Sequence, residues 1–236
     1  MALYLHETSA IDGGGKEGYL EALRTGWAPY AEESRGMRLV WAGSTIGSTA
    51  TWPETMALWE LRDWDHFAAV CDRMYTEHGD DARLAEWWRG SFRFRRRARS
   101  QVLVGAGFSP TLDELLGAGV SGTAYAFTRY AVMPGKVDDF LAALERRVPL
   151  DAALGRRLVG AYEVAFTNDA AYAIWAFPGL VEAGAYQEAV VRDAGVRDWQ
   201  RSVERLLAGG TVEVWGFATP WCPLWPQGYR TETRIW

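Results

Sequence analysis

The sequence contains little cysteine and little histidine, which limits metal and redox chemistry. Its 236 residues include two cysteines, Cys71 and Cys222, and three histidines. The cysteines have neither the close spacing of metal ligands nor the density of a disulfide scaffold. We therefore expect no metal site, and a reduced cytoplasmic compartment is the default localisation.

Long apolar runs and an excess of positive charge are also lacking. No run of about 18 apolar residues occurs, so the sequence predicts no transmembrane helix. The N-terminal segment has no basic region followed by a small-residue cleavage site, so we expect no signal peptide. The formal net charge is −5, whereas a phosphate backbone is bound by concentrated positive charge. We expect neither a membrane nor a nucleic acid as partner.

The main positive feature is an internal duplication. Residues 2–110 and 122–217 carry the same landmarks in the same order, about 120 residues apart, which is the length of a small domain rather than of a solenoid repeat. The paired landmarks are Gly15-Lys16 with Gly135-Lys136, Pro29 with Pro149, Ala57-Leu58-Trp59 with Ala173-Ile174-Trp175, and Trp87 with Trp199.

Hydrophobic periodicity gives each half the order strand, helix, strand, strand, helix, strand. The expected elements of the first half are 2–10, 16–24, 38–47, 55–61, 63–75 with 82–93, and 101–106; those of the second half are 123–132, 137–147, 157–166, 171–177, 182–192 with 196–207, and 211–217. This order is the ferredoxin-like βαββαβ plan. Two such units can pack sheet against sheet, so we predict an α+β fold in which tandem ferredoxin-like units form a fused, pseudo-dimeric α/β barrel.

The expected boundaries are a first unit at 1–110, a linker at 111–121, a second unit at 122–218 and a tail at 219–236. The linker is rich in glycine, and residues 111–116 are expected to form one helical turn within it. The tail is rich in proline and tryptophan and has no helical or strand periodicity. We expect it to lie on a neighbouring surface of its own chain or of a second subunit, so a homodimer is one possible assembly.

Several motifs of the second half resemble those of a known family. Residues 125–130 begin and end with tyrosine, Pro134-Gly135-Lys136 forms a turn before a helix, and residues 155–160 run from one glycine to another. Asn168 then precedes a strand that ends in Trp175. These motifs resemble NIPSNAP-like proteins of the dimeric α/β-barrel superfamily, although residues 126–129 depart from the family pattern. The resemblance implies the fold but no particular chemistry, because the superfamily includes cofactor-free monooxygenases, isomerases, cyclases and haem enzymes.

Candidate catalytic residues come from differences between the halves. His6 stands in mid-strand where the second half has Phe127, and it is a plausible acid or base near neutral pH. Glu7 is the neighbouring carboxylate on the opposite face of the strand. His66 lies in the first turn of a helix, where a neutral imidazole is favoured. Because all three histidines, including His78 in an acidic loop, belong to the first half, we expect the ligand pocket there.

Thirteen tryptophans are many for this length and favour an interior lined by aromatic rings. Alternation places Tyr4, His6 and Thr8 on one strand face, and Tyr125, Phe127 and Arg129 on the equivalent face of the second half. The alternation does not distinguish which face meets the helices. The candidate substrate-binding residues are Tyr4, Trp41, Trp59, Tyr125, Arg129, Tyr162 and Trp175.

One basic segment has a structural interpretation. Residues 92–99 alternate aromatic and basic side chains, and we place them at the end of a helix, where cations complement the helix dipole.

The leading functional interpretation is a cofactor-independent enzyme that acts on a hydrophobic aromatic or polycyclic small molecule. Isomerisation, cyclisation or dehydration by acid/base chemistry is the first choice, because an enclosed aromatic cavity with one or two titratable groups suffices for proton transfer. A cofactor-free monooxygenase, a haem-binding barrel with His6 or His66 as axial ligand, and a non-catalytic NIPSNAP-like binding module are the alternatives.

Overall fold

The computed structural model describes residues 1–76 and 81–227, and within this part eight strands close into one antiparallel barrel. The order around the barrel is β1-β3-β2-β8-β5-β7-β6-β4. The strands are β1 (Leu3–Ile11), β2 (Arg38–Thr45), β3 (Glu54–Leu61), β4 (Arg95–Gly105), β5 (Ala124–Val132), β6 (Arg157–Val164), β7 (Ala170–Phe177) and β8 (Leu207–Ala218). Closure leaves no exposed sheet edge.

Each half of the chain contributes four neighbouring strands. The first half gives the order β4-β1-β3-β2, and the second half gives β8-β5-β7-β6. The halves are joined along two short seams. At one seam residues 43–45 of β2 pair with residues 216–218 of β8, and at the other residues 103–105 of β4 pair with residues 162–164 of β6. The pairing within each half is longer than that at the seams. For example, β1 pairs with β3 over residues 3–10.

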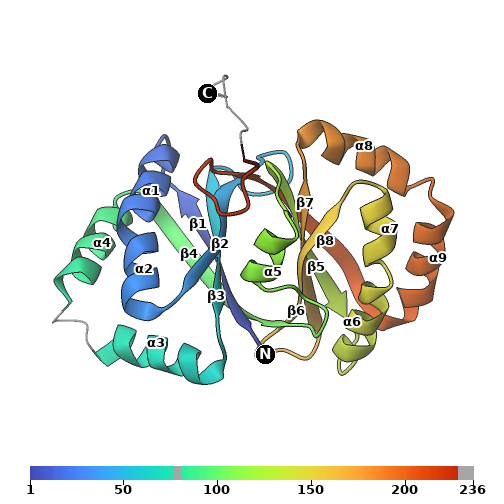
Figure 1. Cartoon of the computed structure of the whole chain (residues 1–236), viewed down its shortest axis with the longest axis horizontal. Helices are drawn as coiled ribbons and strands as arrows, with labels where there is room; N and C mark the ends of the chain where they lie inside the picture. The colour runs from blue at the N-terminus through green and yellow to red at the C-terminus, as the bar shows by residue number, and fades with distance from the viewer. Residues whose placement is uncertain (77–80, 228–236) are drawn as a thin grey trace.

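Helices cover the outside of the barrel on two opposite flanks (Figure 1). The first-half helical segments are α1 (Lys16–Ala22), η1 (Leu23–Trp27), α2 (Ala28–Arg35), α3 (Trp64–Thr76) and α4 (Ala82–Phe92). The second-half segments are α6 (Val137–Glu145), α7 (Val148–Ala153), α8 (Leu180–Val190), α9 (Ala194–Val203) and η2 (Glu204–Leu206). Each flank has its own apolar core between helices and sheet, separate from the core inside the barrel. No helix in the described part of the chain has the length and apolar character needed to cross a membrane.

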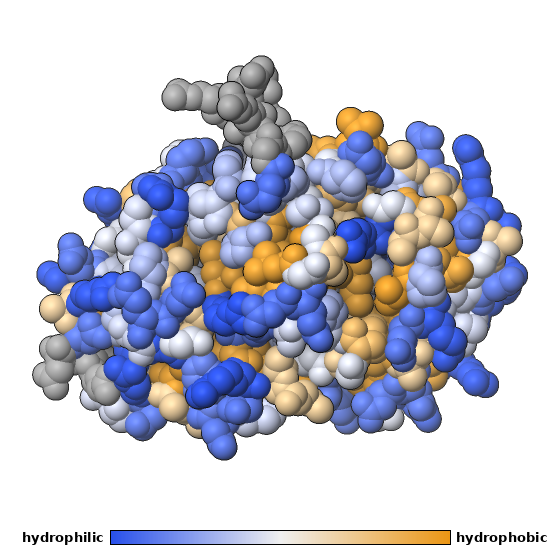
Figure 2. Space-filling view, viewed as in Figure 1, coloured by the Kyte–Doolittle hydropathy of each residue, from blue (hydrophilic) through white to orange (hydrophobic). Residues whose placement is uncertain are grey.

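One end of the barrel is filled and covered. Helix α5 (Leu112–Gly117) starts with a capping box in which Thr111 and Glu114 bond each other's backbone amides, so the expected turn in the linker is confirmed. Leu115 of α5 and Leu224 of the tail pack into the barrel core. In the matching view of Figure 2 apolar residues gather in the middle of this face, and hydrophilic residues lie both between them and along the edges. Of the expected tail, residues 219–227 pack on the chain's own barrel, and 228–236 lie outside the described residues.

The first helix is longer than the sequence suggests. It was expected to run from residue 16 to about residue 24, with Pro29 at its end or just beyond it. Instead the chain passes through the π-helical turn η1 and continues as α2 with Pro29 in its first turn, where no donor is needed. The helical segment therefore extends to Arg35, and Gly36 ends it in the left-handed conformation.

The placement of the basic run at a helix end is wrong for most of its length. Strand β4 begins at Arg95 rather than at residue 101, and α4 ends at Phe92. The arginines of 95–99 pair with β1, where Arg99 faces Thr8 and Arg97 faces Ala10. Alternation along this strand, not a helix dipole, decides which of these side chains point into the barrel.

Candidate functional site

The site is built on the alternation of β1. Tyr4 packs in the core inside the barrel, and His6 and Thr8 follow it on the same face. Leu3 and Leu5 pack on the helix side of the sheet. The sequence did not show which face of β1 meets the helices. In the structure the face that carries His6 lines the barrel interior, and the opposite face meets the helices.

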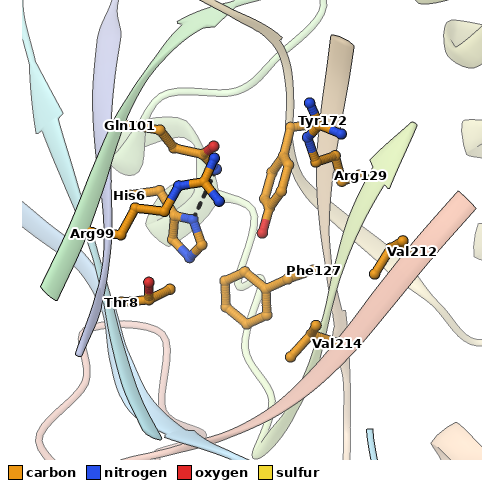
Figure 3. A pocket seen from close by; sticks show the side chains of 9 residues that line it. All are labelled: His6, Thr8, Arg99, Gln101, Phe127, Arg129, Tyr172, Val212 and Val214. Atoms are coloured by element: carbon orange, nitrogen blue, oxygen red, sulfur yellow. Dashed lines mark hydrogen bonds between the residues drawn. The ribbon is translucent and has the colours of Figure 1, made fainter. Parts of the chain in front are cut away.

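Beyond the filled end of the barrel, a cavity of about 150 Å³ opens to solvent (Figure 3). Both halves of the chain line it, so the expectation that the pocket belongs to the first half is wrong. The lining residues are His6, Thr8, Arg99, Gln101, Phe127, Arg129, Tyr172, Val212 and Val214. The first four come from β1 and β4, and the other five come from β5, β7 and β8. The second half supplies most of the apolar wall.

His6 is the most buried titratable group of the cavity. Its side chain lies between the rings of Phe127 and Tyr172, whose centroids are 5.4 Å and 5.3 Å from that of the imidazole. The amide nitrogen of Gln101 lies 3.2 Å from Nδ1 of His6. Nε2 of His6 is buried and has no hydrogen-bond partner. A buried polar atom without a partner is costly, so it indicates a position where a ligand atom completes the bonding.

The pKa of His6 is lowered from 6.5 to about 4, chiefly by burial and then by the positive charge of Arg99. The imidazole is therefore neutral at physiological pH. A neutral imidazole has one N–H donor and one lone pair, and the partner of Nδ1 determines which of the two Nε2 presents. With the Gln101 amide nitrogen donating to Nδ1, Nε2 carries the proton. With the amide oxygen accepting from Nδ1–H, Nε2 presents its lone pair.

Tyr172 supplies a second polar atom to the cavity. Its hydroxyl group points toward His6 and Phe127 in Figure 3. Burial raises the pKa of Tyr172, and the opposing positive charges of Arg129 and Arg99 do not cancel this effect. The phenol stays protonated at neutral pH and can donate a hydrogen bond to a ligand oxygen.

Glu7 is outside the cavity, on the helix side of β1. It accepts a hydrogen bond of 2.8 Å from Nε1 of Trp59. Its pKa is raised, because burial outweighs that hydrogen bond and the charge of Arg95. Glu7 cannot act as an alternative base for a ligand in the barrel, because the sheet lies between its carboxyl group and the cavity that His6 lines.

His66 is also remote from the cavity and joins two helices. Its Nδ1 accepts from the backbone N–H of Arg62 at 3.2 Å, and its Nε2 lies 2.6 Å from the carbonyl oxygen of Arg35. With Nδ1 accepting, Nε2–H donates to that carbonyl group. Both ring nitrogens are thus used in linking the end of α2 to the start of α3. His78, the third histidine, lies outside the described residues.

The predicted aromatic wall falls mostly outside the cavity. Tyr4, Trp41, Tyr125 and Tyr162 fill the closed end of the barrel as packed core. There Tyr4 donates to Glu60 and Tyr125 donates to the carbonyl oxygen of Leu224.

The two remaining tryptophans of the predicted wall face the helices. Trp59 and Trp175 pack in the layers between sheet and helices, so they correct the expectation of a ligand contact inside the barrel. Among the predicted substrate-binding residues, Arg129 lines the cavity.

The sequence analysis missed two lining residues on β4, and for Arg99 the reason is that this strand was predicted to start too late. Arg99 and Gln101 lie opposite Thr8 and His6 in the β1–β4 pairing. A strand starting at residue 95 places Arg99, Gln101 and Leu103 on one face by alternation, so the signal was present in the sequence. Tyr172 follows the same logic, since it alternates with small alanines in β7.

The described residues contain no group of three or more His, Cys, Asp or Glu side chains arranged to hold a metal ion. His6 is accompanied in the cavity by arginine, amide and hydroxyl groups, and arginine is not a metal ligand.

Comparison with known protein families gives a match in the second half of the chain. Residues 125–223 match the NIPSNAP family model. This match confirms the resemblance noted in the sequence. None of the curated proteins matches the chain.

Solved structures match the fold of the whole chain. An anthrone oxidase-like protein has a TM-score of 0.64 at 15% identity, over 92% of this chain and 91% of that chain. A proposed monooxygenase from Lactobacillus acidophilus NCFM has a TM-score of 0.61 at 6% identity, over 92% and 93%. Another from Fusobacterium nucleatum subsp. nucleatum has a TM-score of 0.58 at 10% identity, over 92% of both chains. At these identities the similarity concerns the fold.

Proposed function

We propose that the protein is a cofactor-independent enzyme that binds a small hydrophobic aromatic molecule in the His6 cavity and transfers a proton through His6. The observation that carries this proposal is the buried Nε2 of His6, which faces a partly apolar cavity without a protein partner. The hydroxyl group of Tyr172 is available to a ligand oxygen in the same cavity. A polar pair in an otherwise apolar enclosure is the arrangement that acid/base catalysis needs.

The charges around His6 favour a substrate that becomes negative during the reaction. The field of Arg99 disfavours imidazolium, and the same field stabilises an anion formed beside it. Deprotonation of an acidic C–H or O–H group at Nε2 would place the new negative charge near Arg99 and the Tyr172 hydroxyl group. The deprotonated substrate then isomerises, cyclises or loses water, and the protonated His6 returns the proton to the product or to the leaving hydroxyl group.

The size of the cavity limits the part of the substrate that enters. A cavity of about 150 Å³ corresponds to the space that holds one benzene ring. A single aromatic ring therefore fits beside Phe127, and any further rings of a polycyclic substrate extend through the open mouth.

Oxygenation is the second candidate, and it shares the first step. In this reaction the deprotonated substrate is the reductant and dioxygen is the oxidant. The apolar wall of Phe127, Val212 and Val214 suits an uncharged diatomic gas. Two of the structural neighbours are named monooxygenases and one is named anthrone oxidase-like, and this naming favours the same chemistry.

The two candidates are tested together with single-ring phenols and cyclic ketones in D₂O. Exchange of the acidic C–H, followed by proton NMR without oxygen, reports proton transfer; oxygen uptake in air reports oxygenation. His6→Phe should lower either rate by about 10²–10⁴-fold, the usual contribution of a general acid or base. A folded His6→Phe variant with wild-type exchange and oxygen uptake would rule out the proposed role of His6.

Haem does not fit this site. The free Nε2 of His6 would be the axial ligand, but the space around it holds about one benzene ring rather than a macrocycle. His66 has both ring nitrogens engaged by the backbone. We therefore propose catalysis without haem, and purified protein without a Soret band is the expected observation.

We also infer that the barrel is a fused pseudo-dimer of two ferredoxin-like units. Each half supplies four adjacent strands in the equivalent order, and short seams join the halves. Fragments 1–110 and 111–236, expressed together, should assemble into a barrel with the circular dichroism of the intact chain. If each fragment folds on its own but the two fragments do not associate, the interpretation as a fused pseudo-dimer is contradicted.

A further inference from the structure

The mouth of the His6 cavity carries two arginines that no residue in the described part of the chain neutralises. Arg99 and Arg129 line the cavity, and both side chains are exposed. Neither guanidinium group forms a hydrogen bond or an ion pair with any described residue, although other arginines, such as Arg38 and Arg156, do so. The chain as a whole has a net charge of −5, so two cations that pair with none of the described residues are a local departure from that acidic character.

The two arginines come from different halves of the chain. Arg99 extends from β4 beside His6 and Gln101, whereas Arg129 extends from β5 beside Tyr172 (Figure 3). They therefore flank the opening from two sides. Both charges act on Tyr172, because each lowers its pKa against the stronger effect of burial. The positive field thus reaches the interior of the cavity.

One acidic residue, Glu54, opposes the positive field of the two arginines at Tyr172. Glu54 raises the pKa of Tyr172. Burial raises the pKa of Glu54 itself, and the positive charge of Arg97 opposes that shift. Arg97 and Glu54 oppose each other, so Arg99 and Arg129 remain as the uncompensated charges. Guanidinium groups bind carboxylates with paired hydrogen bonds, which gives directional recognition in addition to attraction.

We propose that the ligand of this cavity is an aromatic carboxylate, with its ring against Phe127 and its carboxylate group held at the mouth between Arg99 and Arg129. This inference rests on the proposed function for the identity of the site, and it adds the substrate class. The cavity volume of about 150 Å³ accepts the ring, and the exposed arginines accept the charged group. The ring is thereby oriented with its inner edge toward Nε2 of His6.

Binding of benzoate and of neutral benzamide by titration calorimetry tests the proposal without requiring turnover. Benzoate should bind the wild-type protein at least 10-fold more tightly than benzamide, because hydrogen bonds to charged groups contribute roughly one to two factors of ten. Arg99→Gln and Arg129→Gln should each reduce the preference, and the double variant should abolish it. Arg146→Gln removes an exposed arginine on another surface and should leave the preference unchanged.

The location of bound benzoate is checked by NMR, in which the resonances of the His6 and Phe127 rings should shift. Equal affinity for benzoate and benzamide, or a benzoate preference that survives the double substitution, would overturn the inference. The outcomes are separable from those for catalysis. If His6→Phe abolishes proton exchange while benzoate shows no preference, the function stands and the carboxylate is wrong. If the preference is present but His6→Phe leaves exchange intact, the carboxylate site stands and the role of His6 is wrong.

Discussion

The imidazole of His6 stacks on the ring of Phe127 across the barrel, with centroids 5.4 Å apart and 15° between the planes. The sequence aligns these two residues as counterparts in the two halves of the chain. The structure thus brings the polar member of the pair against its apolar equivalent inside one cavity. Of this pair, His6 is the titratable ring, and the contact places it at the junction of the two halves.

Stability should depend on pH through His6. Its pKa is about 4 in the folded protein and 6.5 ordinarily, so the unfolded chain binds more protons between these values. The free energy of unfolding should therefore fall as pH is lowered from about 6.5 to about 4, by up to roughly 3 kcal/mol. Glu7, whose pKa is raised, contributes with the opposite sign.

Substitution of His6 by phenylalanine separates these contributions. The variant copies the second half and keeps a ring against Phe127, so it should fold. Urea unfolding from pH 7 to pH 4 should show a smaller loss of stability in His6→Phe than in the wild type, since Glu7 is common to both. Parallel pH curves for the two proteins would show that His6 is not held neutral by the fold.

Gln101 should set the proton position on His6. It acts as a positioning residue, because its amide contacts Nδ1 at 3.2 Å. Gln101→Glu places a carboxylate there, which accepts from Nδ1–H, leaves the lone pair on Nε2 and raises the pKa of His6. The acid limb of the turnover–pH profile should move to higher pH, and imidazole NMR should report the same shift.

The conservative variant Gln101→Leu is the control for packing at this position. It keeps a side chain of similar size but removes the partner of Nδ1, so the tautomer is no longer fixed. Turnover should fall while the position of the acid limb changes less than in Gln101→Glu. An identical profile in both variants would mean that Gln101 contributes only packing.

The seam between β2 and β8 should not tolerate a side chain at Gly43. A Cβ atom there would lie 2.2 Å from the carbonyl oxygen of Phe217 and 2.6 Å from the Trp41 ring. The carbonyl group belongs to the paired strand and cannot move without opening the seam. Gly43→Ala should lower the free energy of unfolding by about 1–3 kcal/mol or more, the range for overpacking.

Gly184 provides the matched control for this substitution. It lies in the exposed face of α8, and a Cβ atom there meets nothing within 4 Å. Gly184→Ala should be neutral or stabilising by up to about 1 kcal/mol, because alanine has the higher helix propensity. Thermal unfolding of both variants checks the pair, and equal effects would contradict the role given to the seam.

Most of the fold could be predicted from the sequence, because the strand and helix periodicities and the duplicated landmarks can be read from short segments of the chain. The strand alternation of β1 correctly grouped Tyr4, His6 and Thr8. The start of β4 was misplaced, because a run of arginines resembles a solvated helix end as much as a strand at a barrel rim. Local patterns do not encode which strands pair across a seam, and so the meeting of β4 and β7 side chains in one cavity required the closed barrel.

The positions of the aromatic residues also could not be predicted fully from the sequence. Alternation separates the two faces of a strand but does not give depth along the barrel axis. Tyr4 and His6 share a face, yet Tyr4 is packed core and His6 lines the cavity. Trp59 and Trp175 were selected for residue type, whereas the helices that cover them decide their environment.

A buried ionic cluster in the second half should be critical for stability. Asp151 accepts from Nε of Arg147 at 2.8 Å and from the hydroxyl group of Tyr186 at 2.6 Å. Its other oxygen lies 3.8 Å from Nε of Arg156, whose guanidinium group also stacks 4.4 Å over the ring of Trp175. The carboxylate and both arginines are almost fully buried.

Asp151→Asn should therefore destabilise the fold strongly, because it removes the negative charge between two buried guanidinium groups. Breaking one partner of a buried ion pair costs about 3–5 kcal/mol. Tyr186→Phe removes one hydrogen bond to the same carboxylate and one from Arg147, and it should cost about 1–3 kcal/mol. Asp139→Asn removes the exposed partner of Lys136 and should cost about 1 kcal/mol or less. Urea unfolding of the three variants should give that order, and an Asp151→Asn variant as stable as Asp139→Asn would show that the cluster does not hold the helices to the barrel.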